Sequence, residues 1–551
     1  MSREISALQN ARATYRPKLP RALRTGKVGV KLGSPTEPAT HKEEVKSLFP
    51  NTHGQPEVKL IEDDGRLSSA PLIVGAVLSG GQAPGGHNVI AGLFDALKAA
   101  NPQSRLFGFL KGPGGVIKGK HKELTAEIID GYRNTGGFDM IMSGRDKIEK
   151  PEELAACKAN FAQMRLDGLV VIGGDDSNTN AAVLAEYLRA EGSATCIVGV
   201  PKTIDGDMKN EQIEASFGFD TASKLYSELI GNICRDATSA VKYWHFIRLM
   251  GRSASHVTLE CALQTHPNVA IISEEVQEKG STLREVVDYI ADIVIKRSEA
   301  GKDYGILIVP EGLPEFIPEI KALIEELSTI LGADEDYIHD LPDHSERVQY
   351  LNTKLSDHSA RVYGFLPVDI QEVLLKRDSH GNVPLSQVET ERLLIDLVSD
   401  KFRLMADRGQ NAPKFSPLAH FFGYEGRCAP PSNFDADYCY SLGHAAAQLV
   451  RAGLTGYTAN VQNMTRPSDE WVAGGTPVTM MLNIENRKGK AVPVIKKALV
   501  DLDGAPFRLF AEHRDKWAIE DCYVFPGPIQ YFGPSEVCDA PTRTLAMEKG
   551  S

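Results

Sequence analysis

The segment VVIGGDDSNTNAA, residues Val170–Ala182, carries the clearest indication of the fold class of this chain. Its β-branched apolar run stops at Gly173 and Gly174, two aspartates and a serine follow, and the chain continues as the helix-like run AAVLAEYLRA. A strand, a glycine turn and a helix N-terminus in this order are typical of a phosphate-binding site. Two adjacent carboxylates, Asp175 and Asp176, are unexpected there because phosphate is also negative. Either a metal ion lies between a carboxylate and the phosphate, or a carboxylate keeps some ligand out.

Strands and helices alternate on both sides of this stretch. Buried strands are predicted at PLIVGAVLSGG, SRLFGFL, LDGLVVIGG and ATCIVGVPKTIDGD, with amphipathic helices such as HNVIAGLFDALKAAN between them. The alternation resumes later with KYWHFIRLMGRSA, VAIISEE, LREVVDYIADIVIKRSEAG and YGILIVPEGL. Continuous apolar strands separated by helices predict parallel sheets covered on both faces, in which ligands bind beyond the carboxyl ends of the strands.

The predicted fold class is therefore α/β, with two Rossmann-like three-layer α/β/α domains that have parallel-sheet cores. We also expect an N-terminal extension, because the first 70 residues are polar, proline-punctuated and weakly periodic, and a helical insertion that breaks the alternation. The predicted divisions are 1–70 for the extension, 71–220 for the first domain (completed by about 426–490), 221–312 for the second domain (completed by C-terminal segments), 313–420 for the mainly helical insertion, and 421–551 for a further loop and the C-terminal segments.

Composition and charge narrow the class of protein. The chain has 551 residues and a net charge of -12, from 73 acidic and 61 basic residues, which argues against a nucleic-acid partner bound through phosphate neutralisation. No apolar run approaches the length needed to cross a bilayer, and the first twenty residues contain no secretory signal, so we expect a cytoplasmic protein without a membrane partner. No CxxC pair is present, and the cysteines are interpreted as buried thiols of a reducing compartment: Cys157, Cys196, Cys234, Cys261, Cys428, Cys439, Cys522 and Cys538.

The segment GVPKTIDGDMKN, residues 199–210, carries the most specific chemistry. Lys202, Asp205 and Asp207 fall within six residues at the end of a predicted buried strand. If the segment is extended, the two aspartates point to the same side. One carboxylate then accepts a proton while the other orients it or a metal ion. The alternative is a turn with solvated charges.

Other strand-end loops also carry polar or glycine residues. Gly81 lies in VLSGGQAPGGHNVIAG, a loop that either binds an anion or needs glycine only for its turn; it has neither the dinucleotide fingerprint nor a P-loop ending. GPGGVIKGKH has the glycine and lysine spacing of a P-loop, but His121 stands where Ser or Thr should bind magnesium. Several later loops combine acidic and basic groups, which together suggest a phosphorylated polyol as ligand, although each residue alone is better explained by a surface or structural role: Arg252, Glu311, Tyr424 and Arg427.

Taken in order, SGGQAPGGHN, GGDDS, PKTIDGD, MGR, PEG and GYEGR resemble the phosphofructokinase family. The resemblance covers about residues 72–312 and 420–450, and the extension and insertion fit the long, pyrophosphate-dependent form of the family. ATP-using members have a glycine where this chain has Asp176 and another where it has Lys202. The GYEGR loop departs from the histidine-bearing loop of the short ATP-using enzymes.

The resemblance implies a reaction and a role for each matching residue. A phosphoryl group passes reversibly from pyrophosphate to the 1-hydroxyl of fructose 6-phosphate, with Mg²⁺ as cofactor, in glycolysis and gluconeogenesis. Asp175 holds the magnesium ion and Asp176 excludes ATP, while Lys202 and the Gly81 N–H bind pyrophosphate. Asp205 accepts the proton of the attacking hydroxyl and Asp207 supports that base.

The resemblance also implies a sugar-phosphate site and a homodimer. The residues carried over as substrate contacts are Thr203, Ile204, Asp205, Met250, Gly251, Arg252, Glu311, Tyr424, Glu425, Gly426 and Arg427. Lys242 and Tyr243 match a phosphate contact that comes from the partner subunit, so the sugar-phosphate site is expected to be shared. Arg145 is a candidate to bridge the two phosphates.

Two other functions stay open at this point. An ATP-dependent 6-phosphofructokinase would have to tolerate Asp176 and Lys202 beside ATP. A non-catalytic regulatory subunit should have lost the base or the metal ligand, whereas Asp175, Asp205, Arg252 and Glu311 are all present. A dinucleotide-dependent oxidoreductase is disfavoured because the glycine fingerprint is missing.

Overall fold

The computed structural model describes residues 6–63, 67–376, 387–487 and 490–528. The chain divides into two units, each built on its own sheet. The first contains the chain up to Ala222 together with Tyr424–Ala498, and the second contains Ser223–Gly423 together with Leu499–Gly527. The prediction of two α/β domains is confirmed. Within the described ranges, no helix is both long and apolar enough to span a membrane.

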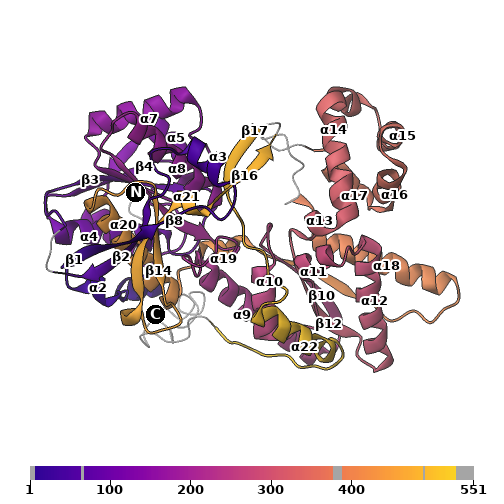
Figure 1. Ribbon diagram of the computed structural model, residues 1–551. Helices are drawn as coiled ribbons and strands as arrows, with labels where there is room; N and C mark the ends of the chain where they lie inside the picture. Colours follow the sequence, from indigo (N-terminus) through magenta and orange to yellow (C-terminus); the bar gives the residue numbers. More distant parts are fainter. Residues whose placement is uncertain (1–5, 64–66, 377–386, 488–489, 529–551) are drawn as a thin grey trace, which may run out of the picture. The chain divides into compact units, whose positions relative to one another are not determined.

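The first unit is built on a large mixed sheet, several of whose strands are labelled in Figure 1. The strand order is β1-β2-β15-β14-β8-β7-β3-β4-β5. The pairs from β14 to β4 are parallel and those at both edges are antiparallel. The strands are β1 (Val28–Pro35), β2 (Pro56–Glu62), β3 (Ile73–Ser79), β4 (Arg105–Phe109), β5 (His121–Glu123), β7 (Gly168–Gly173), β8 (Cys196–Thr203), β14 (Tyr457–Gln462) and β15 (Val472–Pro477), with β6 (Ser143–Gly144) beside β3 and β9 (Phe217–Gly218) beside β8.

Helices cover both faces of this sheet. On one face, Leu169 and Val171 of β7 share a buried cluster with side chains of α7 (Pro151–Met164) and α8 (Asp175–Ala190). On the other face, a Cβ added at Gly168 would lie 2.6 Å from Val450 of α20 (Asn433–Arg451). Successive strand residues point to opposite faces, so β7 is buried on both sides as its continuous apolar run predicts. The unit's remaining helices are α1 (Ala7–Ala13), α2 (Arg21–Arg24), α3 (Lys42–Leu48), α4 (Gly86–Ala100), α5 (Pro113–Ile117), α6 (Ala126–Asp130), α19 (Tyr424–Cys428), η2 (Ser468–Glu470) and α21 (Val478–Met481).

Residues 1–70, expected as an extension, supply two strands to the same sheet. β1 and β2 pair antiparallel, and β2 pairs antiparallel with β15. A second hairpin, β16 (Leu482–Arg487) with β17 (Lys490–Ile495), forms a separate two-stranded sheet in this unit.

The second unit has a four-stranded parallel sheet in the order β11-β12-β10-β13. Its strands are β10 (Tyr243–Leu249), β11 (Val269–Ala270), β12 (Tyr304–Pro310) and β13 (Pro417–Phe422). Its helices are α10 (His256–Thr265), α11 (Ser273–Glu278), α12 (Leu283–Glu299) and α22 (Ala505–Ile519), preceded by α9 (Phe219–Ala240), whose first residues belong to the first unit.

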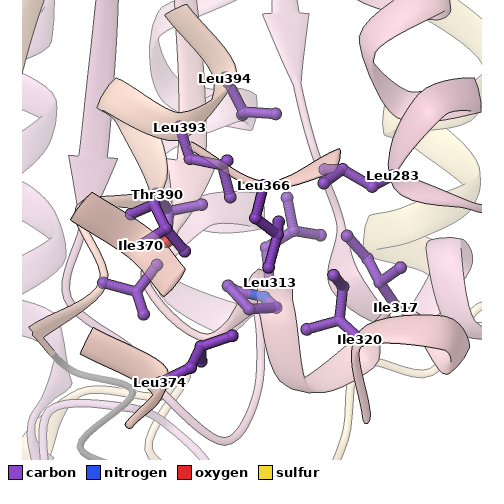
Figure 2. A pocket seen from close by; sticks show the side chains of 12 residues that line it. Leu283, Leu313, Ile317, Ile320, Leu366, Ile370, Leu374, Thr390, Leu393 and Leu394 are labelled. Carbon is purple, nitrogen blue, oxygen red and sulfur yellow. The ribbon is translucent and has the colours of Figure 1, made fainter. Parts of the chain in front are cut away.

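Residues 313–420 add a group of helices to this second sheet. The described helices there are α13 (Leu313–Phe316), α14 (Pro318–Asp340), α15 (His344–Lys354), α16 (Asp357–Phe365), α17 (Val368–Leu374) and α18 (Thr390–Asp407). Figure 2 shows the aliphatic side chains that converge where these helices meet α12, among them Leu283, Leu313, Ile317, Leu366 and Leu393. The insertion thus belongs to the same buried core as β10, α12 and β12.

The cysteines are mostly buried, as expected. Seven of the eight lie in the described ranges and are free: Cys157, Cys196, Cys234, Cys261 and Cys439 are buried, and Cys428 and Cys522 are half-buried. Burial raises the pKa of the Cys157 thiol to about 12, so this thiol stays protonated. Cys538 lies outside the described residues.

Candidate active site

Three neighbouring parallel strands of the first unit end at one edge of its sheet. β3 ends at Ser79 before the loop that holds Gly81, β7 ends at Gly173, and β8 ends at Thr203. β7 pairs in parallel with both β3 and β8, so their carboxyl ends lie side by side. The predicted pyrophosphate and metal residues therefore gather at this edge, which we call the donor edge: Gly81, Asp175, Asp176, Lys202, Thr203, Asp205 and Asp207.

Polar side chains next to the glycines hold the donor-edge loops in place. The buried Asn178 donates from Nδ2 to the carbonyl oxygens of Gly173 (2.7 Å) and Gly174 (2.9 Å), which fixes the turn from β7 into α8. Gly80, with a φ of +80°, donates its N–H to the Gly144 carbonyl at 2.9 Å. Ser143 Oγ donates to the Gly80 carbonyl at 2.6 Å. The loop before Gly81 is thereby tied to β6, which ends directly before the exposed Arg145.

Lys202 is a buried cation at this edge, with a side chain only 6% exposed. Burial lowers its pKa to about 8, opposed by the charges of Asp205, Asp175 and Asp207. A Cβ added at Gly80 would lie 3.5 Å from its Nζ, so the ammonium sits against the glycine loop after β3. A desolvated ammonium in this position attracts an anion strongly, because the low local dielectric strengthens the interaction.

The aspartates around Lys202 follow a bent segment rather than an extended one. β8 ends at Thr203, the Asp205 N–H donates to Thr203 Oγ1 at 3.1 Å, and Gly206 has a φ of +74°. The alternation expected for an extended segment therefore does not apply. Asp205 is half-buried and Asp207 is buried, and both still act on the charge of Lys202.

Asp175 and Asp176 form the first turn of α8, where a carboxylate is stabilised by the helix dipole. Asp175 Oδ2 and Asp207 Oδ2 each lie 3.7 Å from the Nζ of Lys497. These two carboxylates thus face one cation-sized space, and carboxylate oxygens are the ligands that Mg²⁺ prefers. Asp176 is more exposed, at 64%, and pairs with Lys147 at 3.7 Å.

Arg427 lies next to the donor-edge glycines in the same unit. A Cβ added at Gly81 would be 3.7 Å from Arg427 Nη1. The guanidinium lies 4.5 Å from the ring centroid of Tyr424, in the same short helix α19. Its buried Nε has no hydrogen-bond partner among the described residues. Arg427, predicted to contact the sugar phosphate, is therefore also close enough to contact a ligand bound beside Gly81.

In the second unit, the predicted sugar residues follow two paired strands. β10 and β12 pair in parallel, and the pairing ends at Leu249 and Pro310. The Glu311 N–H then donates to the Leu249 carbonyl at 2.9 Å. Gly251 has a φ of +130°, and a Cβ added at Gly312 would overlap the carbonyl oxygen of Arg252.

This close approach brings the segments Met250–Arg252 and Glu311 together. The exposed Arg252 pairs through Nε with Oε1 of Glu315 at 2.8 Å.

Lys242 and Tyr243 lie at the opposite end of β10 from these residues. The strand between Tyr243 and Leu249 is about 20 Å long at about 3.3 Å per residue. Lys242 is exposed, and its Nζ lies 4.7 Å from the ring centroid of Tyr243. Within one chain these two residues are thus not brought to Arg252 and Glu311.

Sequence reasoning missed Lys147 and Lys497. Lys147 follows the two-residue strand β6, which the sequence pattern did not predict, and Lys497 reaches the donor edge from a distant part of the chain. The stretch GPGGVIKGKH does not have the arrangement of a P-loop. Gly114 lies inside the short helix α5, and His121 begins β5, so no strand, loop and helix surround Lys120.

Known proteins resemble this chain over most of its length. The family model "Phosphofructokinase" matches residues 73–347. The "Pyrophosphate--fructose 6-phosphate 1-phosphotransferase" of Porphyromonas gingivalis is 56% identical over 99% of this chain and 99% of its own length. The chain belongs to the phosphofructokinase family. The Treponema pallidum member with the same name is 53% identical over 99% of this chain and 97% of its own length.

Among plant members of the phosphofructokinase family, the Arabidopsis thaliana enzyme's "subunit beta 2" is 51% identical over 94% of this chain and 90% of its own length. A solved structure titled as pyrophosphate-dependent phosphofructokinase from Marinobacter aquaeolei superposes with a TM-score of 0.52 at 14% identity, over 82% of this chain and 93% of that chain. This likeness supports the shared fold.

Proposed function

We propose that this chain transfers a phosphoryl group from pyrophosphate to the 1-hydroxyl of fructose 6-phosphate, reversibly, giving fructose 1,6-bisphosphate and phosphate. The observation that carries the proposal is the buried ammonium of Lys202 beside the donor-edge glycines. The resemblance implies that ATP-using members of the family have a glycine in place of Lys202. Full-length relatives named for the same reaction support it. Pyrophosphate is compact and highly charged, so it suits a site that offers a buried cation.

Magnesium is the cofactor that the donor edge fits. Asp175 and Asp207 face the same small space, and no group of three metal-ligating side chains occurs in the described ranges. Mg²⁺ is commonly held by one or two carboxylates together with substrate phosphates and water, so two carboxylates suffice. When bound, Mg²⁺ neutralises phosphate charge.

The chain's own residues then supply positioning and proton transfer. Lys202 and the Gly81 N–H hold the donor, and Asp205 accepts the proton of the sugar 1-hydroxyl. Asp207 supports that base, while Thr203 and Ile204 border the acceptor. Arg252 binds the sugar phosphate, since a guanidinium matches phosphate geometry, and Glu311 accepts hydrogen bonds from sugar hydroxyls. Further sugar-phosphate contacts come from Met250, Gly251, Tyr424, Glu425, Gly426 and Arg427, and Arg145 bridges the two phosphates.

We also propose that the protein is a homodimer with a shared sugar-phosphate site. Lys242 and Tyr243 are separated from Arg252 by the length of β10, so they serve the site of a partner chain more readily than their own. The free thiols fit the cytoplasm as the location, because a reducing compartment keeps them unpaired.

A comparison of donors tests the proposed function. Purified protein is mixed with fructose 6-phosphate and MgCl₂ and either pyrophosphate or ATP, and fructose 1,6-bisphosphate is measured. Product with pyrophosphate and little with ATP supports the proposal. Product mainly with ATP identifies an ATP-dependent kinase, and no product with either donor supports a non-catalytic subunit.

A further inference from the structure

Lys497 is a cation of the donor edge that the proposed reaction does not yet use. Its Nζ lies 3.7 Å from Asp175 Oδ2 and 3.7 Å from Asp207 Oδ2, so one ammonium is shared by two carboxylates. The Asp207 side chain is 10% exposed and that of Lys497 is 41% exposed. Lys497 therefore lies on the solvent side of the largely buried Asp207.

The backbone on both sides of Lys497 is fixed. Before it, Ile495 at the end of β17 is buried in a cluster with Leu482 and with Ala182 of α8. After it, the Ala498 N–H donates to the Asp207 carbonyl at 2.7 Å. The side chain is long and flexible, so its ammonium can change partners while the main chain stays at the donor edge.

A divalent ion and this ammonium compete for the same oxygens. Asp175 is the predicted magnesium ligand, and Asp207 faces the same space. Two cations are unfavourable in one small site, so the ion displaces the ammonium from at least one carboxylate. Pyrophosphate arrives with the metal as a polyanion, and a lysine ammonium is a common partner for phosphate.

We infer that Lys497 is a donor-binding residue that exchanges partners. It pairs with Asp175 and Asp207 while the donor edge is empty, and it binds pyrophosphate once a divalent ion occupies the carboxylates. The inference deepens the proposed function and rests on it, because it takes pyrophosphate as the donor.

The test compares Lys497→Met, which keeps most of the side-chain stem without the charge, with Lys496→Met at the adjacent exposed position. Mn²⁺ binding is first measured without pyrophosphate, from the electron paramagnetic resonance signal of the free ion. Lys497→Met should bind Mn²⁺ at least about threefold more tightly than wild type, because a competing charge is gone. Lys496→Met should bind Mn²⁺ as wild type does.

Steady-state kinetics then test the donor contact. In Lys497→Met, the KM for pyrophosphate should rise about tenfold while the KM for fructose 6-phosphate stays unchanged. Lys497→Arg should restore most of the pyrophosphate affinity, because it restores the positive charge. Unchanged or weaker Mn²⁺ binding in Lys497→Met overturns the inference, and so does a pyrophosphate KM equal to that of Lys496→Met. If the wild type makes no product from pyrophosphate, it is the proposed function that is wrong. The Mn²⁺ measurement then still tests whether Lys497 competes with a divalent ion for Asp175 and Asp207.

Discussion

The ammonium of Lys202 is buried at the end of β8, where a charged side chain is costly without a partner of opposite charge. Asp175, Asp205 and Asp207 provide negative charge around it, yet its pKa is still lowered to about 8 because burial dominates. A bound polyanion adds negative charge near the ammonium and so offsets the cost of burial that these carboxylates offset only in part. At the scale of single residues, the donor edge is therefore built to gain from a strongly charged ligand.

Asp205 is the proposed base that accepts the proton of the sugar hydroxyl. Asp205→Asn removes the base but keeps the shape of the side chain, so turnover should fall about a hundredfold to ten-thousandfold. Binding of fructose 6-phosphate, measured by calorimetry, should change little. Glu211→Gln, at an exposed carboxylate farther along the same segment, is the control and should keep wild-type turnover. Near wild-type turnover in Asp205→Asn would assign the base to another group.

Asp176 is predicted to exclude ATP. Its side chain is 64% exposed at the first turn of α8, so it presents both volume and negative charge at the donor edge. Asp176→Gly removes both obstacles and should raise the ratio of kcat/KM for ATP to that for pyrophosphate. Lys202→Gly should lower kcat/KM for pyrophosphate, because the donor loses a buried cation.

The ratio is compared in the wild type, the two single variants and the double variant, since changes at neighbouring sites need not be additive. A ratio that is flat between wild type and Asp176→Gly, in a folded and active enzyme, removes the excluding role from Asp176.

At the scale of elements, the strand ends could be predicted from the sequence because each combines an apolar run with glycine or charged residues. Lys202, Asp205 and Asp207 share one such segment, so their proximity follows from chain connectivity alone. β1 could not be predicted as part of the first sheet, because only its first two residues are buried and its apolar signal is correspondingly weak. Lys497 could not be placed either, since a long-range contact through a hairpin leaves no local pattern.

The insertion is coupled to the predicted sugar-binding loops through helix α18. Thr390 Oγ1 donates to the Glu311 carbonyl at 3.2 Å. The next residue, Glu391, pairs with Arg248 of β10 at 2.8 Å, and both side chains are buried. A buried pair of this kind is costly to break from one side, so it fixes the register between α18 and β10. The start of α18 thus supports the main chain that presents Glu311.

Strands β10 and β13 carry a pH-sensitive contact in the core of the second unit. His245 is 3% exposed, and its Nδ1 lies 2.9 Å from Nε2 of His420. Burial lowers the pKa of His245 to about 4, with His420 as a second cause and Asp236 opposing. An unfolded histidine has a pKa of about 6.5, so the unfolded chain binds more protons between these values. The free energy of unfolding should therefore decrease as the pH falls from about 6.5 towards 4.

His245→Gln should make this decrease shallower, as measured from urea unfolding midpoints between pH 4 and 7. Buried His444, whose pKa is also lowered to about 4 by burial, accounts for part of the slope that remains. His121→Gln, at an exposed position, should leave the slope of the wild type unchanged. Equal slopes in His245→Gln and wild type would show that His245 does not titrate on unfolding.

At the scale of the whole molecule, the proposed shared site makes activity depend on two chains. Lys242→Ala and Arg252→Ala should each have low activity as pure proteins, because every site then lacks one of its phosphate contacts. In a dimer that carries one copy of each variant, one site has both defects and the other has none. Random mixing makes half of the dimers mixed, so the mixture should recover up to about a quarter of wild-type activity.

The measurement is activity after the two variants are mixed under conditions that allow subunit exchange, with the unmixed variants as controls. Mass photometry of the wild type first establishes whether dimers are present. Recovery well above the sum of the separate activities places Lys242 and Arg252 on different chains of one site. If the dimer exchanges subunits and activity stays at the sum of the separate activities, both residues serve the site of their own chain. A different conformation of the chain would then have to bring Lys242 close to Arg252.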